Sequence, residues 1–119
     1  MKTIIRKNTW LLRDIPGHPE FNMDFGWGNG YVLIPIGHKY HGVNYNDIDV
    51  SVHGGLTYGK LMTKENAEFW NLDKEDVGTW CVGFDTAHCD DTLAKYPKEY
   101  VQAEADNLAK QLNGVAIPE

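Results

Sequence analysis

Long hydrophobic runs are missing from this chain of 119 residues. No stretch approaches the roughly 20 apolar residues that a membrane-spanning helix needs, so we expect no membrane partner. The first residues, Met1 to Arg6, also lack the apolar run of roughly 7 to 15 residues that a signal peptide requires. We therefore expect a cytoplasmic protein in which Cys81 and Cys89 are free thiols. A disulfide between them, across a predicted turn, is the alternative.

Clustered positive charge is also lacking. The chain has 11 Lys and Arg against 17 Asp and Glu, a formal net charge of −6, and its longest basic run is Arg6-Lys7. Binding along a phosphate backbone needs a concentrated basic surface, so the sequence predicts no nucleic-acid partner. The acidity favours solubility instead.

The residues that are present are sufficient for one compact domain over residues 1–119. Hydrophobic residues make up 42% of the chain, which includes 4 Trp, 6 Tyr and 4 Phe. This composition predicts a real hydrophobic core. An irregular insertion is expected over residues 61–78, in which Thr63 is suited to cap a short helix over residues 64–70.

Strand-like and helical patterns are separated along the chain. The helical period begins at Pro97 and places a narrow apolar stripe on one face, formed by Val101, Ala105, Leu108 and Leu112. We predict an α+β fold, with a small, mainly antiparallel β-sheet and a C-terminal helix packed on one of its faces. The predicted strands cover residues 3–12, 31–36, 48–53 and 79–85.

Two alternating segments end in turns that contain a histidine. The first alternates apolar residues at positions 48, 50 and 52 with Asp49, Ser51 and His53. The second alternates apolar residues at 80, 82 and 84 with Cys81, Gly83 and Asp85. If the strands are neighbours, the apolar side packs against the helix, and a polar cluster forms on the opposite face. That cluster would join Asp49, His53, Asp85 and His88.

This cluster could hold a metal ion. Asp85 and His88 lie on one side of a helical turn, and with His53 they offer imidazoles and carboxylates that suit Zn or Mn. A bound divalent ion could activate a water molecule. The candidate metal ligands are His53, Asp85, His88 and Asp90, with Asp91 as the alternative to Asp90.

The cluster could also work without a metal, because a histidine beside an aspartate can act as a general base. The candidate catalytic residues are His53, Asp85 and His88. Adjacent glycines would let a ligand approach the backbone closely, which gives a candidate ligand-binding set of Asp49, His53, Gly54, Gly55, Asp85 and His88.

A purely structural role is the alternative for the same residues. Asp85 and His88 would then form a hydrogen-bonded turn, and Asp90 or Asp91 would cap the following helix. Gly54-Gly55 would be only a turn.

Three other reactive side chains have structural interpretations. Cys81 lies in the middle of a predicted strand among large apolar residues, which favours a packed and inert thiol. His38 and His41 lie in a polar loop and are predicted to be surface residues, with a ligand role as the alternative.

Several phrases of this sequence resemble a family of small, functionally uncharacterised proteins of bacteriophages, prophages and some bacteria. The resemblance is carried chiefly by Val52-His53-Gly54-Gly55-Leu56-Thr57-Tyr58 and Gly83-Phe84-Asp85-Thr86-Ala87-His88. It covers most of residues 29–112 and implies no particular reaction. The carboxylate that follows the histidine in the family corresponds to Asp90 or Asp91. The resemblance implies a cytoplasmic accessory protein of an infected host cell, with a role in counter-defence.

Three functional hypotheses follow from these patterns. The first is a phage-type accessory protein that binds a small polar, nucleotide-like ligand at the His/Asp cluster. The second is a metal-dependent hydrolase that uses His53, Asp85 and His88. The third is a non-enzymatic inhibitor of a host protein, so the partner is a small molecule or a host protein. The sequence leaves open whether the chain is an enzyme.

Overall fold

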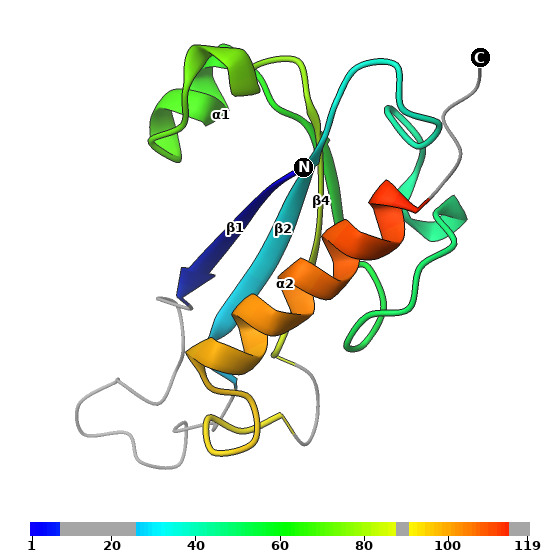
Figure 1. Cartoon of the computed structure of the whole chain (residues 1–119). Coiled ribbons are helices and arrows are strands. Elements are labelled where there is room, and N and C mark those ends of the chain that lie inside the picture. The colour runs from blue at the N-terminus through cyan, green and yellow to red at the C-terminus, as the bar shows by residue number, and fades with distance from the viewer. Residues whose placement is uncertain (8–25, 88–90, 115–119) are drawn as a thin grey trace.

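An open antiparallel β-sheet of four strands forms the centre of the computed structural model, which describes residues 1–7, 26–87 and 91–114. The strand order is β1-β2-β4-β3, so β2 and β4 are the two central strands (Figure 1). The predicted α+β fold is confirmed. The strands are β1 (Lys2–Lys7), β2 (Gly28–Ile34), β3 (Tyr58–Leu61) and β4 (Trp80–Asp85).

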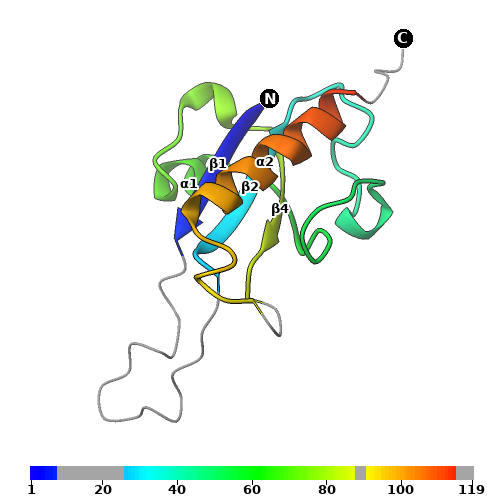
Figure 2. The same cartoon turned by 60° about the horizontal axis from the view of Figure 1, so that its bottom comes forward.

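The C-terminal helix α2 (Lys98–Asn113) lies across one face of the sheet, over β1 and β2 (Figures 1 and 2). Its predicted apolar stripe is fully buried and packs against the central strands; the core residues of this face are Val32, Ile34, Val82, Phe84, Val101, Ala105, Leu108 and Leu112. The close approach depends on Gly30, where an added Cβ would lie 2.5 Å from the Phe84 ring and 3.2 Å from the Cβ of Ala105.

The opposite face of the sheet carries a second apolar cluster. The short helix α1 (Lys64–Phe69) contributes to it, and the Thr63 side chain caps this helix by accepting a hydrogen bond from the backbone N–H of Asn66. A 3₁₀ turn, η4 (Lys74–Asp76), follows. A polar face opposite α2 was predicted, and this is wrong for the middle of the sheet. The buried residues there are Tyr31, Leu33, Met62, Ala67 and Cys81.

Residues 48–57 form a loop after the 3₁₀ turn η3 (Tyr45–Asp47), so the strand predicted over residues 48–53 is wrong. Val50 and Val52 do pack against the core on the α2 side. The backbone of Ser51, however, bonds to the Gln111 side chain: its N–H donates to Oε1 and its C=O accepts from Nε2, each at 2.8 Å. A side-chain amide of α2 replaces a neighbouring strand, so alternating burial occurs without a β-ladder.

The other predicted strands agree more closely with the structure. The strand predicted over residues 31–36 is β2, which ends before Pro35, and that over residues 79–85 is β4. The strand predicted over residues 3–12 is β1, and positions 8–12 lie outside the described residues. None of the helices in the described part of the chain has the length and hydrophobicity to cross a bilayer.

Candidate functional site

His53 and Asp85 lie on different sides of the sheet. Residues 80, 82 and 84 of β4 belong to the core beneath α2, whereas Cys81 belongs to the second cluster. Because successive side chains of a strand alternate, Asp85 shares the face of Cys81. His53 instead contacts side chains of α2. The structure therefore separates two of the residues that were predicted to converge.

His53 is the centre of a network at the N-terminal end of α2. Its Nε2 lies 2.9 Å from Oδ1 of Asp91, and its Nδ1 lies 3.1 Å from the hydroxyl of Tyr100. Its backbone N–H donates to Oε2 of Glu104 at 3.1 Å. The rings of Tyr96 and Tyr100 meet the imidazole edge-on, with centroids at 4.4 and 5.6 Å. These contacts fasten the loop of residues 48–57 to the helix.

The hydrogen-bond partners assign the protons of this network. A carboxylate only accepts, so Nε2 of His53 carries a proton and donates it to Asp91. In the neutral ring, Nδ1 accepts from the Tyr100 hydroxyl. In the imidazolium, Nδ1 donates to that hydroxyl, which then turns its own proton toward Oε2 of Glu104 at 3.4 Å. Protonation of His53 therefore reverses the direction of one hydrogen bond without breaking the chain of contacts.

Burial, followed by the nearby Glu104 carboxylate, raises the pKa of the Tyr100 hydroxyl to about 12. The hydroxyl thus keeps its proton at neutral pH and serves as a hydrogen-bond donor. Both ring nitrogens of His53 are engaged by protein groups, and its side chain is only 12% exposed. The arrangement supports a role in positioning the loop rather than in contacting a substrate.

Asp91 does not have the helix-capping role that its place in the sequence suggested. It was considered as a cap for the following helix, but α2 begins at Lys98 with Pro97 as its N-cap. The Asp91 side chain is 5% exposed and bonds to His53. The predicted site residues His88 and Asp90, together with Cys89, lie outside the described residues.

The recorded hydrogen bonds of Asp49, Gly54 and Gly55 are to other groups than the side chains of His53 and Asp85. Asp49 is exposed, and its backbone N–H donates to the Tyr40 hydroxyl at 3.4 Å. Gly54 and Gly55 have φ values of 67° and 81°, and the N–H of Gly55 donates to the C=O of Val52 at 2.9 Å. The two glycines form a tight turn that needs the left-handed conformation.

Among the residues that the structure describes, no three His, Cys, Asp or Glu side chains are grouped so that they could hold a metal ion. The proposed set of His53, Asp85, His88 and Asp90 includes two residues outside that description. The metal site accordingly stays a prediction.

The remaining reactive side chains have structural roles. Cys81 is buried, and burial raises the pKa of its thiol to about 12. His38 was predicted at the surface but is buried: its Nδ1 accepts from the N–H of Tyr40, so its Nε2 donates to the Leu112 carbonyl at 2.9 Å. His41 bonds the Gly78 carbonyl at 2.7 Å.

A pocket of about 200 Å³ lies beside Asp85, at one end of β2 and β4. We call it the Asp85 pocket. Asn29 and Asp85 are partners in the β2–β4 register and face the side away from α2. The lining residues are Asn29, Tyr31, Thr57, Tyr58, Phe84 and Asp85.

The polar groups of the Asp85 pocket are held by neighbouring hydrogen bonds. The Asp85 carboxylate accepts from the Thr57 hydroxyl at 2.9 Å and from the Ala87 N–H at 3.0 Å. The Asn29 amide donates to the Tyr31 hydroxyl at 3.3 Å, and its Oδ1 is buried with no hydrogen-bond partner. A buried acceptor without a partner costs free energy unless another molecule supplies a donor.

The aromatic walls of the Asp85 pocket depend on one glycine. Tyr31 and Tyr58 meet edge to face, with ring centroids 5.3 Å apart. A Cβ at Gly83 would lie 2.3 Å from the Tyr31 ring, so only glycine lets that ring lie across β4. Burial raises the pKa of both tyrosine hydroxyls, which therefore stay protonated at neutral pH.

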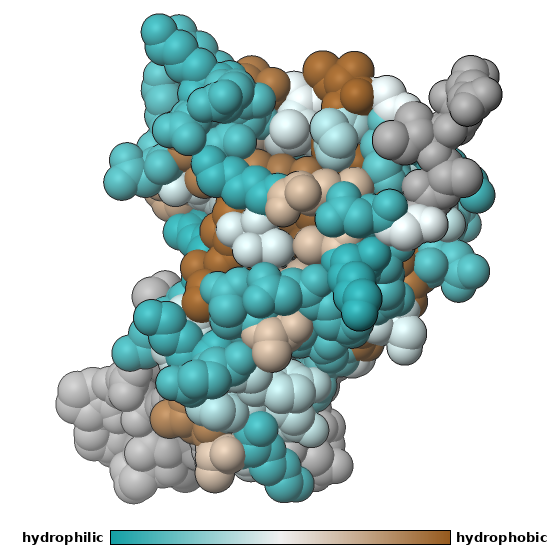
Figure 3. Space-filling model, viewed as in Figure 1, coloured by the Kyte–Doolittle hydropathy of each residue, from teal (hydrophilic) through white to brown (hydrophobic). Residues whose placement is uncertain are grey.

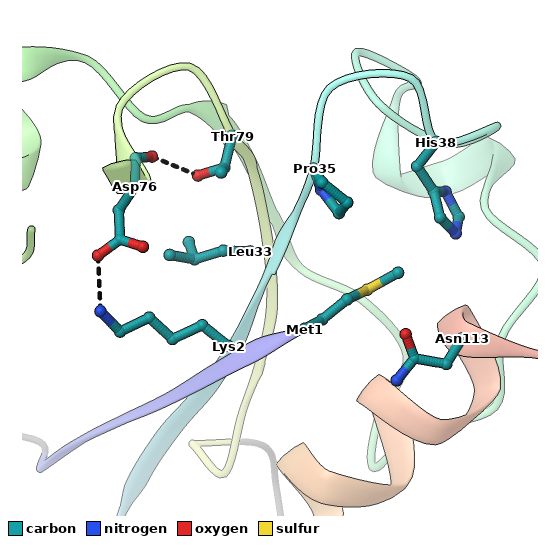
Figure 4. Close-up of a pocket in the computed structure, with 8 residues that line it drawn as sticks. All are labelled: Met1, Lys2, Leu33, Pro35, His38, Asp76, Thr79 and Asn113. Atoms are coloured by element: carbon teal, nitrogen blue, oxygen red, sulfur yellow. Dashed lines mark hydrogen bonds and ion pairs between the residues drawn. The ribbon is translucent and has the colours of Figure 1, made fainter. Parts of the chain in front are cut away.

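A larger pocket of about 350 Å³ lies near the other end of the sheet, between β1, α2 and η4 (Figure 4). Most of its polar groups are already engaged within the protein. The Lys2 ammonium bonds Asp76 at 2.6 Å, and the Thr79 hydroxyl donates to the Asp76 carbonyl at 2.6 Å. Both ring nitrogens of His38 are also bonded. Besides apolar contact, this pocket offers the side-chain amide of Asn113 as a polar group.

The sequence analysis missed Asn29, Tyr31, Thr57 and Tyr58 as candidate binding residues. A signal was available in the alternation of β2, since Asn29 and Tyr31 must share a face. The missing information was the pairing of β2 with β4, which places this face beside Asp85.

No protein-family model, curated protein or solved structure matches this chain. The resemblance to small phage proteins therefore remains a prediction from the residues alone.

Proposed function

We propose that this chain binds a small, planar, polar ligand of nucleobase size in the Asp85 pocket. The observation that carries the proposal is the buried Oδ1 of Asn29, which has no hydrogen-bond partner and lies beside the Asp85 carboxylate in a pocket with aromatic walls. A few polar groups placed between apolar walls are typical of small-molecule sites.

The volume of the pocket limits the size of the ligand. An engineered protein cavity of about 150 Å³ binds benzene, so about 200 Å³ suits one heterocyclic ring with its substituents. The rings of Tyr31 and Tyr58 supply flat apolar surface.

The hydrogen-bond acceptors of the pocket, which belong to Asp85 and Asn29, determine which edge of a ligand can bind there. An ionised carboxylate and an amide oxygen both accept hydrogen bonds, so the ligand must present N–H donors. The amino-bearing edges of cytosine, adenine and guanine meet this requirement, whereas uracil presents fewer donors. A nucleoside or a nucleotide fits if its sugar lies outside the pocket.

The biological setting is part of the same proposal. The resemblance to phage and prophage proteins supports an accessory protein that acts in the cytoplasm of an infected cell, where sequestering such a ligand would counter a host defence. No observation among the described residues favours the metal-dependent hydrolase.

Calorimetric titration with cytidine, adenosine, guanosine and uridine tests the proposal. We expect at least one amino-bearing nucleoside to bind, and Asp85→Asn to weaken that binding about tenfold because it removes the negative charge beside the donor edge. Asp49→Asn is the matched control, since it removes one exposed carboxylate elsewhere. Binding by none of the nucleosides, or equal loss in both variants, would contradict the proposal.

A further inference from the structure

β1 is an edge strand with one partner. It pairs with β2 along residues 2–7, and no described strand pairs with its other side. Residues 3–6 are half-buried, so the strand is fixed in the sheet rather than loosely attached. The outer edge of such a strand presents backbone N–H and C=O groups that can pair with a further strand.

A groove of about 470 Å³ runs beside this edge, between β1 and the flank of α2. Ile5 lines it from the strand and Ala103 from the helix, and the Gln102 amide donates to the Thr3 hydroxyl at 3.4 Å. Figure 3 shows hydrophobic surface at the position of β1, bordered by the hydrophilic surface of α2. An added strand could therefore place one side chain against Ile5 and Ala103 in this groove while its backbone extends the sheet.

The charge of β1 contrasts with that of the chain. Its sequence Lys-Thr-Ile-Ile-Arg-Lys contains three cations and no acid, in a protein with a net charge of −6. Lys2 is already paired with Asp73 and Asp76, so Arg6 and Lys7 carry the positive charge of this edge that no acid of the described chain is recorded as pairing. The basic residues lie at the ends of the strand, and Ile4 and Ile5 lie at its centre. The wall of the groove that α2 forms contributes one cation, Lys98, and two acids, Glu99 and Asp106, so the positive charge of this surface comes from β1 and not from the groove.

The same charges disfavour a second copy of this chain as the occupant. Antiparallel pairing of two β1 strands would set basic residues opposite basic residues at both ends, which is destabilising. An acidic strand has the opposite effect at these positions.

We propose that the outer edge of β1, with the adjoining groove, binds an extended acidic peptide segment of a partner protein, which adds to the sheet as a fifth strand. Main-chain hydrogen bonds to β1 supply affinity, and alternate side chains supply specificity. The complementary segment has acidic residues opposite Arg6 and Lys7 and β-branched residues at its centre. This inference does not depend on the Asp85 pocket, which lies on the other side of the sheet.

A synthetic peptide tests this surface. Acetyl-Glu-Glu-Val-Val-Thr-Glu-amide, laid antiparallel to β1, would place acids opposite Lys7, Arg6 and Lys2 and valines opposite the isoleucines. We expect calorimetry to detect binding and amide hydrogen exchange to slow along β1. The same peptide with Lys in place of each Glu, and one with alternate backbone nitrogens methylated, should not bind.

Two variants on α2 distinguish binding at this groove from a general effect of added negative charge. Ala103→Glu puts a negative charge into the groove and should weaken binding of the acidic peptide about tenfold. Asn107→Glu adds the same charge at another exposed position of the helix and should leave binding unchanged. Circular dichroism would verify that both variants fold.

Four results would overturn the proposal: no binding of the acidic peptide, equal binding of the Lys peptide, equal binding of the methylated peptide, or no effect of Ala103→Glu. Self-association of the chain with slowed exchange along β1 would also overturn it, because the occupant would then be a second copy.

Discussion

The imidazole of His53 and the carboxylate of Asp91 are joined by a hydrogen bond of 2.9 Å, although they lie 38 positions apart in the chain. This contact ties the loop of residues 48–57 to the segment that leads into α2. The Tyr100 hydroxyl bonds the other ring nitrogen, so both polar atoms of the imidazole are engaged. The histidine that stood out in the sequence is thus engaged in holding the fold together.

Asp91→Asn is expected to lower the free energy of unfolding by about 1 to 2 kcal/mol, because it replaces a charge-assisted hydrogen bond in a buried site by a neutral one. Denaturant titration measures the change. Asp49→Asn, at an exposed carboxylate, should shift the unfolding free energy by less than about 0.5 kcal/mol. Equal effects of the two substitutions would show that the contact between His53 and Asp91 contributes nothing.

Tyr100 should make the fold sensitive to alkali. Because its pKa is raised from the usual 10.0 to about 12, the folded state binds its proton more tightly than the unfolded chain does. Its contribution to stability is therefore complete below about pH 10 and is lost as the pH rises toward 12. Tyr100→Phe should flatten the decline in unfolding free energy over this range, measured by denaturant titration at several pH values. An unchanged slope would contradict this assignment.

Cys81 should be chemically inert in the folded protein. It is 1% exposed, and burial raises the pKa of its thiol to about 12, so almost no thiolate exists at pH 8. In a Cys89→Ser variant, which leaves Cys81 as the single thiol, Ellman's reagent should react only after denaturant is added. Rapid reaction of the native variant would mean that the second apolar cluster opens readily.

Gly83→Ala should destabilise the protein strongly. The added Cβ would lie 2.3 Å from the Tyr31 ring and 2.7 Å from the Gly30 carbonyl oxygen, and overpacking of this kind costs about 1 to 3 kcal/mol. Gly59→Ala, in the neighbouring strand β3, is the control because its Cβ would meet only ordinary contacts at 3.4 Å or more. Thermal unfolding compares the two, and similar melting temperatures would contradict the placement of Tyr31.

The periodic elements were predictable from the sequence. The apolar stripe of α2 and the apolar residues 80, 82 and 84 of β4 pack into the same core, so these local patterns predict both elements. The loop of residues 48–57 has the same alternation as β4 but no neighbouring strand. The backbone of Ser51 bonds to the Gln111 side chain instead, and a contact with a side chain 60 positions away leaves no local signal.

The candidate site was predictable only in part. Asp85 was identified as a binding residue, and its pocket is completed by Asn29, Thr57 and two tyrosines that come from β2, β3 and the preceding loop. These residues meet because β4 lies between β2 and β3. Strand order depends on long-range pairing, which the patterns of the separate segments do not encode.

Intermolecular nuclear Overhauser effects would locate the ligand most directly. The nucleoside that binds most tightly is added to the labelled chain, and contacts of its base protons are recorded. The account predicts contacts to the rings of Tyr31 and Tyr58 in the Asp85 pocket. Contacts to Tyr96 and Tyr100 beside His53, in place of these, would contradict it.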